Sequence, residues 1–412
     1  MKRYIYCFFS IVCFCNSFAY DLYVDGVYYN LEIGDNMTLE VTYGDQEYTG
    51  NIIIPENVEY NGKLLKVTKI GPSAFARSSV TTITIPKSVI SIESGAFSSC
   101  TMLSSVSLTE GLGSIYQNAF KNCGDLNEIT IPSSVTHIYK DAFNNSGLKR
   151  LILVDGDKDL SLGNPTSGGH GSSPFQRVGI EYLYLGRNID YFNGNMGPFD
   201  YSNINEAVIG DKVKKIPNYC FQGLYITKLT IPSSVEIIGN ASLNCSTLQE
   251  VIIKDSEQAL FTYCSMPFLK KLYIGRNLIY DSQYSFISIG GEQLEDLILG
   301  ESFTNFNKIV FIADLKTVFS LNENPPTILY ASRVFSSKTY LYGKLYVPEG
   351  CLNIYQEADG WKNFFNIFET SGIDYIKNDK RNTNVRYNLM GQPIGNDYKG
   401  IIIEDGVKKI IR

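Results

Sequence analysis

The sequence predicts a β-rich solenoid, built from short strand-forming units that repeat along most of the 412-residue chain. Three features recur in the same order: an apolar strand-like segment, an Ile-Pro dipeptide and an Ala-Phe pair. Both "ITIPKSVISIESGAF" (83–97) and "ITIPSSVTHIYKDAF" (129–143) contain all three, and "LTIPSSVEIIGNASL" (229–243) has Ser-Leu in the last place. A unit this short cannot bury its own apolar face, so neighbouring units must stack to make a core.

The repeat period is about 22 residues, and such a period indicates a solenoid. Within each unit apolar and polar residues alternate, which predicts a short strand. The proline ends that strand because it has no N–H to donate to a ladder. We expect the phenylalanines of the Ala-Phe pairs, Phe75, Phe97, Phe120 and Phe143, to enter the core. The central apolar residues of the predicted strands are Ile83, Val106, Ile129, Leu151, Leu183, Ala207, Leu229, Val251, Leu272, Leu297, Val318 and Leu345.

Residues 1–19 are predicted to be a secretory signal. Lys2 and Arg3 precede an apolar stretch, and Ser17-Phe18-Ala19 forms a small-x-small pattern with cleavage after Ala19. The residues before Cys13 and Cys15 are large, which disfavours a lipoprotein signal. No later run of about 18 apolar residues exists, so no membrane span is expected in the mature chain. We therefore expect a secreted or cell-surface protein.

The rest of the chain divides into four predicted regions. Residues 20–70 form a β-rich N-terminal cap, and residues 71–348 form the solenoid. Residues 349–370 close it with a capping helix, and residues 371–412 are a linker and a short C-terminal β-rich segment. Inside the solenoid, the Gly- and Ser-rich stretch 156–175 is the most loop-like.

Composition argues against several classes of function. The net charge is −6, with no run of like charges, so we expect no nucleic-acid partner. Asp155, Asp157 and Asp159 alternate like the start of a calcium loop. An EF-hand would need Gly and Glu where Leu160 and Thr166 stand, so a solvated acidic loop is the simpler interpretation.

The two histidines offer no catalytic arrangement. His137 occupies a position that varies between units, and His170 lies in the Gly-rich stretch. Neither is accompanied in the sequence by a nucleophile and an orienting group. We expect no catalytic residues, no metal site and no cofactor, and hence a protein that is not an enzyme.

Six cysteines lie beyond the predicted signal. In an exported chain they permit a disulfide framework. Cys100, Cys123 and Cys245, however, occupy matching repeat positions, where a buried apolar filler is the more common role. We predict unpaired thiols at Cys100, Cys123, Cys220, Cys245, Cys264 and Cys351.

Two columns of side chains are predicted to point outward from the repeat strands, because side chains alternate along a strand. Charges alternate in sign along much of the first column, as in Glu128 and Arg150, which predicts cross-strand ion pairs. The second column changes from Ser and Thr to apolar and aromatic residues between Ile152 and Tyr346.

That change predicts an exposed stripe roughly 40 Å long, a candidate contact surface. Two other interpretations stay open: such residues suit strands in any case, or the longer units cover them. The candidate binding residues are Tyr182, Tyr184, Tyr273, Phe319 and Tyr346.

The unit "LNEITIPSSVTHIYKDAFNNS" (126–146) and its sisters resemble the leucine-rich repeats of the BspA type, found in bacterial surface proteins. The resemblance extends to the N-terminal cap (24–71), to the closing segment (343–369) and to the C-terminal segment (385–412), which is similar to one common in exported proteins of Bacteroides-like bacteria. The units at 155–182 and 254–310 depart from it, since they are longer and lack Ile-Pro-Ser-Ser.

The resemblance implies a non-enzymatic exported protein that acts in adhesion, with an extracellular protein or glycan as its ligand. It supplies no catalytic residues. A structural or assembly role in an extracellular or outer-membrane complex is the alternative.

Overall fold

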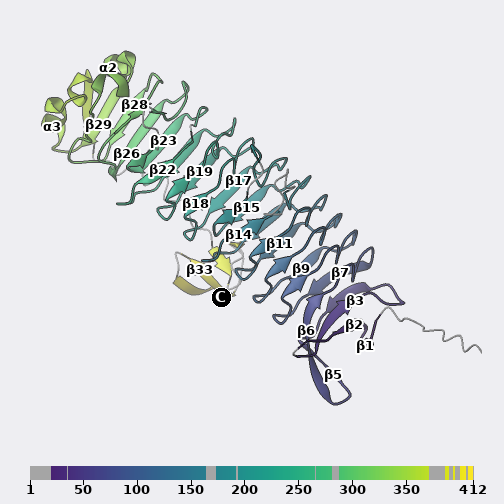
Figure 1. Ribbon diagram of the computed structural model, residues 1–412. Coiled ribbons are helices and arrows are strands. Elements are labelled where there is room, and N and C mark those ends of the chain that lie inside the picture. Colours follow the sequence, from purple (N-terminus) through teal and green to yellow (C-terminus); the bar gives the residue numbers. More distant parts are fainter. Residues whose placement is uncertain are drawn as a thin grey trace, which may run out of the picture.

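The computed structural model is a long β-solenoid, as the repeats predict (Figure 1). It describes residues 20–34, 36–163, 173–191, 194–264, 266–280 and 287–370, together with short strands between 386 and 411. Each coil contributes a strand to one long side, a shorter strand to a second side and a tight turn to the third. The predicted signal lies outside the described residues.

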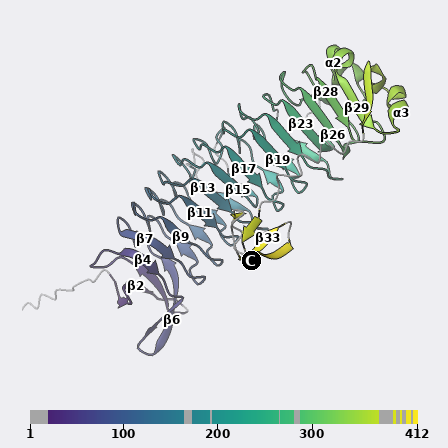
Figure 2. The same ribbon diagram turned by 180° about the vertical axis from the view of Figure 1, so that it is seen from behind.

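The long side consists of parallel strands that run side by side along one face (Figure 2). They form three consecutive sheets: β4-β7-β9, β11-β13-β15-β17 and β19-β21-β23-β26-β28-β29-β30. The predicted central residues pair in register, for example Ile83 with Val106 and Leu272 with Leu297. The strands are β4 (Thr49–Ile53), β7 (Ser79–Thr84), β9 (Ser105–Ser107), β11 (Glu128–Ile131), β13 (Arg150–Leu153), β15 (Tyr182–Leu185), β17 (Glu206–Ile209), β19 (Lys228–Ile231), β21 (Glu250–Ile253), β23 (Lys271–Arg276), β26 (Asp296–Ser302), β28 (Thr317–Ser320), β29 (Lys344–Pro348) and β30 (Asn366–Thr370).

The second side is made of strands of two or three residues, also parallel. Where their side chains are described, each buries an isoleucine or leucine, as Ile92, Ile115 and Ile138 do. These strands are β8 (Ser91–Ile92), β10 (Ser114–Ile115), β12 (His137–Ile138), β14 (Leu160–Leu162), β16 (Ile189–Asp190), β18 (Lys215–Ile216), β20 (Ile237–Ile238), β22 (Leu260–Thr262), β24 (Leu278–Ile279), β25 (Ile287–Ser288) and β27 (Ile309–Val310).

The third side is a turn that carries the predicted phenylalanine ladder. Phe97 and Phe120 stack with ring centroids 5.1 Å apart and planes within 5°. Phe75 and Phe143 continue the stack at 5.0 Å and 5.1 Å. Backbone bonds join the same turns, since the N–H of Phe97 donates to the Ala119 carbonyl at 2.7 Å. The ladder is confirmed.

The residue two places after each ladder phenylalanine has a left-handed backbone. Arg77, Ser99, Asn122 and Asn145 have φ between 54° and 64°, a region that favours Asn and Gly over other residues. Gly223 fills the same place after Phe221, with φ 70°. A residue with positive φ thus recurs at this corner of the coil, which makes it a fixed part of the repeat.

The N-terminal strands start the stack. An antiparallel group leads into β3, which pairs in parallel with β6, and β6 pairs with β8 of the solenoid. Tyr48 contacts Phe75 at 4.4 Å and so begins the aromatic ladder. These strands are β1 (Leu22–Val24), β2 (Val27–Glu32), β3 (Thr38–Thr42), β5 (Asn57–Tyr60) and β6 (Lys63–Ile70).

The C-terminal end is closed by short helices and by two last strands of the long sheet. The elements are α1 (Ala331–Val334), α2 (Ser337–Tyr342), α3 (Leu352–Glu357) and the 3-10 turn η1 (Trp361–Asn363). The indole N–H of the fully buried Trp361 donates to the Pro326 carbonyl at 2.7 Å. Within the described chain, no helix reaches the length that crossing a bilayer would take. Beyond residue 385 the described strands are β31 (Arg386–Asn388), β32 (Pro393–Ile394), β33 (Gly400–Glu404) and β34 (Val407–Ile411), which form an antiparallel sheet.

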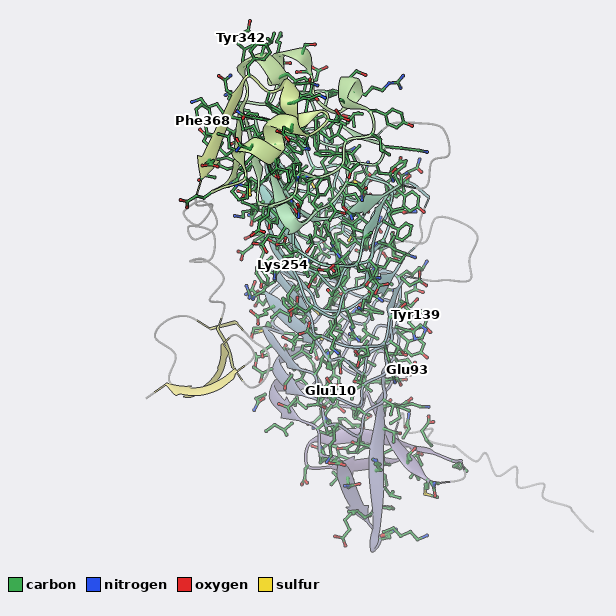
Figure 3. All side chains as sticks on the ribbon, turned by 90° about the vertical axis from the view of Figure 1, so that its left-hand side faces the viewer. Glu93, Glu110, Tyr139, Lys254, Tyr342 and Phe368 are labelled. Carbon is green, nitrogen blue, oxygen red and sulfur yellow. The ribbon has the colours of Figure 1, made fainter. Side chains whose placement is uncertain are left out.

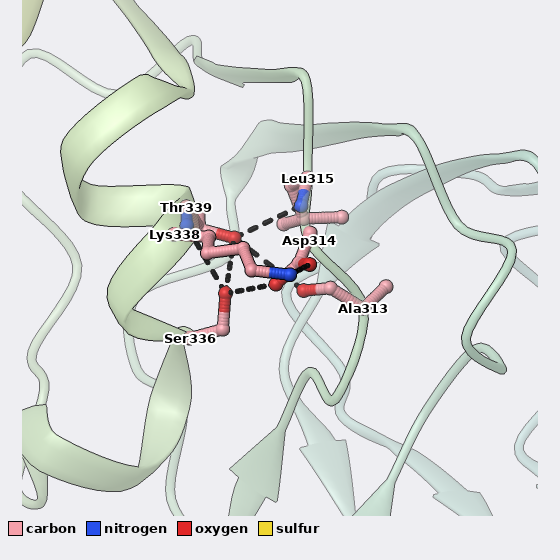
Figure 4. A network of polar contacts seen from close by, with 6 residues as sticks. All are labelled: Ala313, Asp314, Leu315, Ser336, Lys338 and Thr339. Carbon is pink, nitrogen blue, oxygen red and sulfur yellow. Dashed lines mark hydrogen bonds and ion pairs between the residues drawn. The ribbon is translucent and has the colours of Figure 1, made fainter.

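A polar network attaches α2 to the preceding coil (Figure 4). Ser336 caps the helix by accepting the Thr339 N–H at 3.0 Å, and its hydroxyl donates to Asp314 at 2.8 Å. The Thr339 hydroxyl is buried and accepts the Leu315 N–H at 2.9 Å. Lys338 binds the other oxygen of Asp314 at 2.9 Å, and together these contacts hold the pKa of that carboxyl below its usual value. The helix is therefore fixed at its N-terminus by contacts between its own Ser336, Lys338 and Thr339 and residues 314–315 of the preceding coil.

The thiols at matching repeat positions are buried and bonded to the coil before. Cys100 donates to the Phe75 carbonyl at 2.9 Å, Cys123 to Phe97 at 3.1 Å and Cys245 to Phe221 at 2.6 Å. All six cysteines in the described residues are free thiols, and only Cys351 is not fully buried. Burial raises the pKa of Cys245 to about 12, which keeps the thiol protonated and unreactive.

Replacing Phe120 by Ala should destabilise the protein by about 3–5 kcal/mol, because it removes a fully buried ring from the middle of the ladder. Hydrogen exchange should show the lost protection centred on the flanking coils, since contacts are between neighbours. Phe365→Ala, at a ring that is 76% exposed, is the matched control and should change little. Undiminished protection around Phe120 would contradict the ladder's role.

Alkylation of the native protein should label Cys351 quickly and the other five cysteines only after unfolding. The reason is burial, which excludes the reagent and suppresses the thiolate. Intact mass after labelling in denaturant, without reductant, should show six modified thiols in the mature chain. A loss of free thiols in pairs would show disulfides instead.

Candidate functional site

The five predicted binding residues lie on the outward face of the long sheet, and all five are half-buried. The predicted stripe is not continuous, however. Ile152 and Ile298, which belong to the same column, are only 1% and 3% exposed. Tyr184 is the register partner of Ile152, and Tyr273 that of Ile298, so a ring beside each isoleucine covers it. The prediction of one unbroken 40 Å stripe is therefore wrong.

Around β15 the outward face holds a tyrosine, an arginine and a glutamate in contact. The Arg150 guanidinium lies over the Tyr182 ring, 3.6 Å from its centroid. Its Nε lies 3.4 Å from a carboxylate oxygen of Glu128 on the strand before. Further along, Glu250 lies 3.2 Å from Lys228 and 3.7 Å from Lys271. The predicted cross-strand ion pairs in the first column are confirmed.

Two other tyrosines of the face bind aspartates of the preceding coil. The Tyr184 hydroxyl donates to Asp155 at 2.8 Å, and the Tyr273 hydroxyl donates to Asp255 at 2.6 Å. Both aspartates are exposed, and each lies two residues after the last residue of a long strand. Although Asp155 is exposed as a whole, its carboxylate is partly shielded from water by the neighbouring coils, and this desolvation raises the pKa of Asp155. The hydrogen bond from Tyr184 acts on that pKa in the opposite direction.

Glycines make room for each tyrosine–aspartate pair. A Cβ at Gly210 would lie 2.5 Å from the Asp155 carboxylate and 2.9 Å from the Tyr184 hydroxyl oxygen. Gly300 stands in the same relation to the second pair, with the Tyr273 hydroxyl oxygen 2.6 Å from its hypothetical Cβ. Each pair thus combines residues from three consecutive coils: the aspartate, the tyrosine and the glycine.

The remaining two candidates belong to an aromatic row at the C-terminal end of the sheet. Phe319 and Tyr346 stack at 4.6 Å, and Tyr346 contacts Phe368 at 5.6 Å. Phe368, on the last strand, is 44% exposed and was not among the predicted residues. Figure 3 shows it at the same end of the molecule as Tyr342, which is 75% exposed.

Two buried arginines, which the sequence analysis missed, support the units that depart from the repeat. Arg187 is fully buried and donates to the carbonyls of Pro132, Ser133 and Val135 at 2.7–2.8 Å, two coils away. A Cβ at Gly156 would lie 3.3 Å from its Cδ, so glycine leaves space for the arginine to pass. Burial lowers the pKa of Arg187 to about 10, which still leaves it charged at neutral pH.

Arg276 repeats this arrangement and donates to the carbonyls of Pro232 and Ser233 at 2.8 Å and 3.0 Å. The sequence contained a pattern that could have predicted both arginines: "LYLGRN" (183–188) and "LYIGRN" (272–277) differ at one position only. Each hexapeptide contains the buried arginine and the tyrosine of the nearby tyrosine–aspartate pair.

The acidic and histidine side chains that the sequence analysis considered for calcium binding or catalysis form hydrogen bonds or ion pairs with neighbouring residues, where the structure describes them. Asp157 binds Lys212 at 2.9 Å, and Asp159 accepts from Asn188 at 3.0 Å. His137 is half-buried, and its Nδ1 lies 3.0 Å from the Thr136 hydroxyl. His170 and Thr166 lie outside the described residues. In the part of the chain that the structure describes, no three His, Cys, Asp or Glu side chains gather as metal ligands.

The fold is a repeat solenoid whose long sheet carries the candidate residues on its outward face. The chain belongs to the BspA-type leucine-rich repeat family, whose model matches residues 49–160 and 195–316 in six copies.

Several solved structures are similar to this chain. A leucine-rich repeat protein from Bacteroides ovatus is 18% identical, with a TM-score of 0.36 over 85% of this chain and 100% of that one. One from Bacteroides capillosus is 39% identical, with a TM-score of 0.28 over 30% of this chain and 92% of that one. A leucine-rich cell surface protein from Faecalibacterium prausnitzii is 18% identical, with a TM-score of 0.35 over 86% and 96%. No curated protein matches the sequence.

Replacing Arg187 by Ala should destabilise the protein by about 3 kcal/mol, since two buried carbonyls and one partly buried carbonyl lose a charged donor. The loss of hydrogen-exchange protection should appear at residues 132–138, two coils from the substitution. Lys212→Ala, which removes an exposed ion pair, should change stability by less than about 0.5 kcal/mol. A loss of protection confined to residues near position 187 would contradict the proposed reach of the arginine.

Proposed function

We propose that this protein is a non-enzymatic, exported binding protein that acts in adhesion through the outward face of its long sheet. The observation that carries the proposal is a change of side chains along one column. The early coils build the face with Thr84, Ser107 and Thr130, whereas later coils place half-exposed aromatic rings on the same strands. Folding does not require that change, since both kinds of coil have the same core and register. The proposed binding residues are Tyr182, Tyr184, Tyr273, Phe319 and Tyr346.

Aromatic side chains are suited to this role. A tyrosine presents a large, fairly rigid surface with a polar tip, and tyrosine is enriched in protein interfaces. Its ring can also stack on a sugar. The ligand class that fits is an extracellular protein or a glycan, presented by a host, by the matrix or by other cells.

Placement outside the cell is part of the proposal. Its support is the predicted signal at residues 1–19 and the BspA-type family. One of the solved structures similar to this chain is described as a cell surface protein. Non-enzymatic action is supported by the family's repeat architecture and by the engagement of Asp157, Asp159 and His137 with neighbouring side chains.

A scaffold role in an extracellular or outer-membrane complex is the second candidate. The observation that favours it is the C-terminal end of the solenoid, where Tyr342, Phe365 and Phe368 are exposed. Terminal coils usually carry a polar outer face, so apolar side chains there suit a permanent neighbour. A pull-down from the extracellular fraction separates the two roles, because a scaffold should recover bacterial proteins and an adhesin foreign ligands.

Tyr184→Ser and Tyr273→Ser, made together, should weaken binding to a ligand found by screening host proteins and glycans by at least about tenfold, the effect of losing two interface tyrosines. Surface capture of the purified mature chain is the measurement, with folding checked by thermal melting. Tyr116→Ser and Tyr139→Ser, made together, are the matched control, because both are half-buried rings beside the short strands. Unweakened capture by the folded double variant would move the binding site away from the long sheet.

A further inference from the structure

We propose that Tyr184–Asp155 and Tyr273–Asp255 are two equivalent subsites for cationic side chains, and that together they recognise an extended basic segment of a protein partner. The inference rests on the proposed function and specifies the chemistry of its ligand. It predicts arginine or lysine in the partner, at a spacing set by the solenoid.

The two subsites are built from the same short sequence motifs, which follow one another in the same order along the chain. Ile-Pro-Ser-Ser-Val occurs at 131–135 and again at 231–235, and each copy supplies the carbonyls that a buried arginine binds. The aspartate, the tyrosine and the glycine follow at 155, 184 and 210 in one copy, and at 255, 273 and 300 in the other. The same interactions therefore occur twice, although the loops between them differ in length.

Each subsite offers an aromatic face and a carboxylate side by side. The tyrosine hydroxyl donates to one carboxylate oxygen, and a carboxylate with two oxygens can accept further hydrogen bonds but can donate none. A ligand that fits must supply donors. A guanidinium or ammonium group supplies them and is attracted by the ring as well.

The protein shows this recognition in its own side chains on the same face. Arg150 lies 3.6 Å above the Tyr182 ring and 3.4 Å from Glu128, in contact with one ring and one carboxylate at once. Tyr182 is two residues from Tyr184 on β15, so the pattern lies directly beside the first subsite. A partner's arginine would make the same two contacts at Tyr184 and Asp155.

The charges around both subsites complement a cation. Near the first subsite, the basic residues are Lys158, Lys212 and the buried Arg187, and Lys212 is itself bound to Asp157 at 2.9 Å. Near the second, the basic residues are Lys254 and the buried Arg276. The acidic residues outnumber them by one in each case: they are Asp155, Asp157, Asp159 and Asp211 at the first subsite, and Asp255, Glu257 and Glu301 at the second. This balance favours a cation over an anionic polymer.

The spacing between the subsites limits what can bind both. Four strand steps separate β15 from β23, through β17, β19 and β21, and the step from β17 to β19 joins two neighbouring sheets. At about 4.8 Å a step the two tyrosines are roughly 19 Å apart. An extended peptide advances about 3.3 Å per residue, so two cationic side chains about six positions apart would reach both subsites.

The test uses a Ser/Thr peptide with two arginines six positions apart, together with a peptide of the same composition whose arginines are three apart and one with glutamine in place of arginine. Saturation-transfer NMR with the mature chain should show contact at the arginine side-chain CH2 protons. Titration should give the six-apart peptide at least about a tenfold advantage over the three-apart peptide, because it engages both subsites at once. Added salt should weaken that binding.

Asp155→Asn and Asp255→Asn, made together, should remove the advantage of the six-apart peptide. Asparagine keeps an acceptor for each tyrosine hydroxyl, so the variant loses charge rather than structure. Asp25→Asn and Glu59→Gln, made together at exposed positions among the N-terminal strands, are the charge-matched control and should leave binding unchanged. Thermal melting of all variants separates loss of binding from loss of folding.

Equal binding of the arginine and glutamine peptides, no preference for the six-apart peptide, or undiminished binding by the Asp155/Asp255 variant would overturn the inference. Suppose instead that a neutral oligosaccharide from the screen binds through Tyr184 and Tyr273, while the arginine peptide neither binds nor competes. The basic-segment inference would then be wrong and the proposed function would stand. Conversely, a screen that finds no ligand, alongside peptide binding as described, would support the subsites and count against the adhesive role.

Discussion

Everything in this structure depends on one constraint: a coil of about 22 residues can bury its apolar residues only against the next coil. Three sides of each coil meet that constraint together. Parallel ladders join the long strands and the short strands, and the turns are joined by backbone bonds such as that from Phe97 to Ala119. Inside the turns the phenylalanines stack at 5.0–5.1 Å, close to the spacing of the strands. The register of the backbone and the spacing of the rings thus reinforce each other.

This division of labour explains why the outward face is open to variation. Core, ladder and turn positions are fixed by packing, and the left-handed corner at Asn122 and Asn145 is fixed by backbone conformation. None of these requirements applies to the outward positions. Residues as different as Thr130 and Tyr184 can therefore occupy the same register position of one sheet. The tyrosine–aspartate pairs occur where the Ile-Pro-Ser-Ser turn has been replaced. Gly210 and Gly300, on the coil after each tyrosine, leave the space that the aspartate side chain and the tyrosine hydroxyl occupy. A departure from the repeat therefore coincides with the candidate site.

The sequence was sufficient for the features that depend on neighbours in the repeat. Ile83, Val106 and Leu151 could be placed in strands, and Phe97 and Cys100 in the core, because their positions recur with a fixed period. It was insufficient where a side chain reaches beyond its own coil. Arg187 binds carbonyls two coils away, which no local pattern encodes. Ile152 is buried because of the ring beside it, and alternation along a strand predicts only the side on which a residue lies. The same limit hid the partnership of Tyr184 with Asp155, whose separation in sequence depends on loop length.

The central claim is that ligands bind the outward face of the long sheet, where Tyr184 and Tyr273 lie, and not the loops alone. Hydrogen exchange of the wild-type mature chain, with and without a captured ligand, tests this claim without any substitution. Slower exchange should appear in peptides that cover 182–186 and 271–276, the segments that contain Tyr184 and Tyr273. Slower exchange confined to the loop 156–163 or to the turns that carry Asn122 and Asn145, with no change in those two segments, would contradict the account.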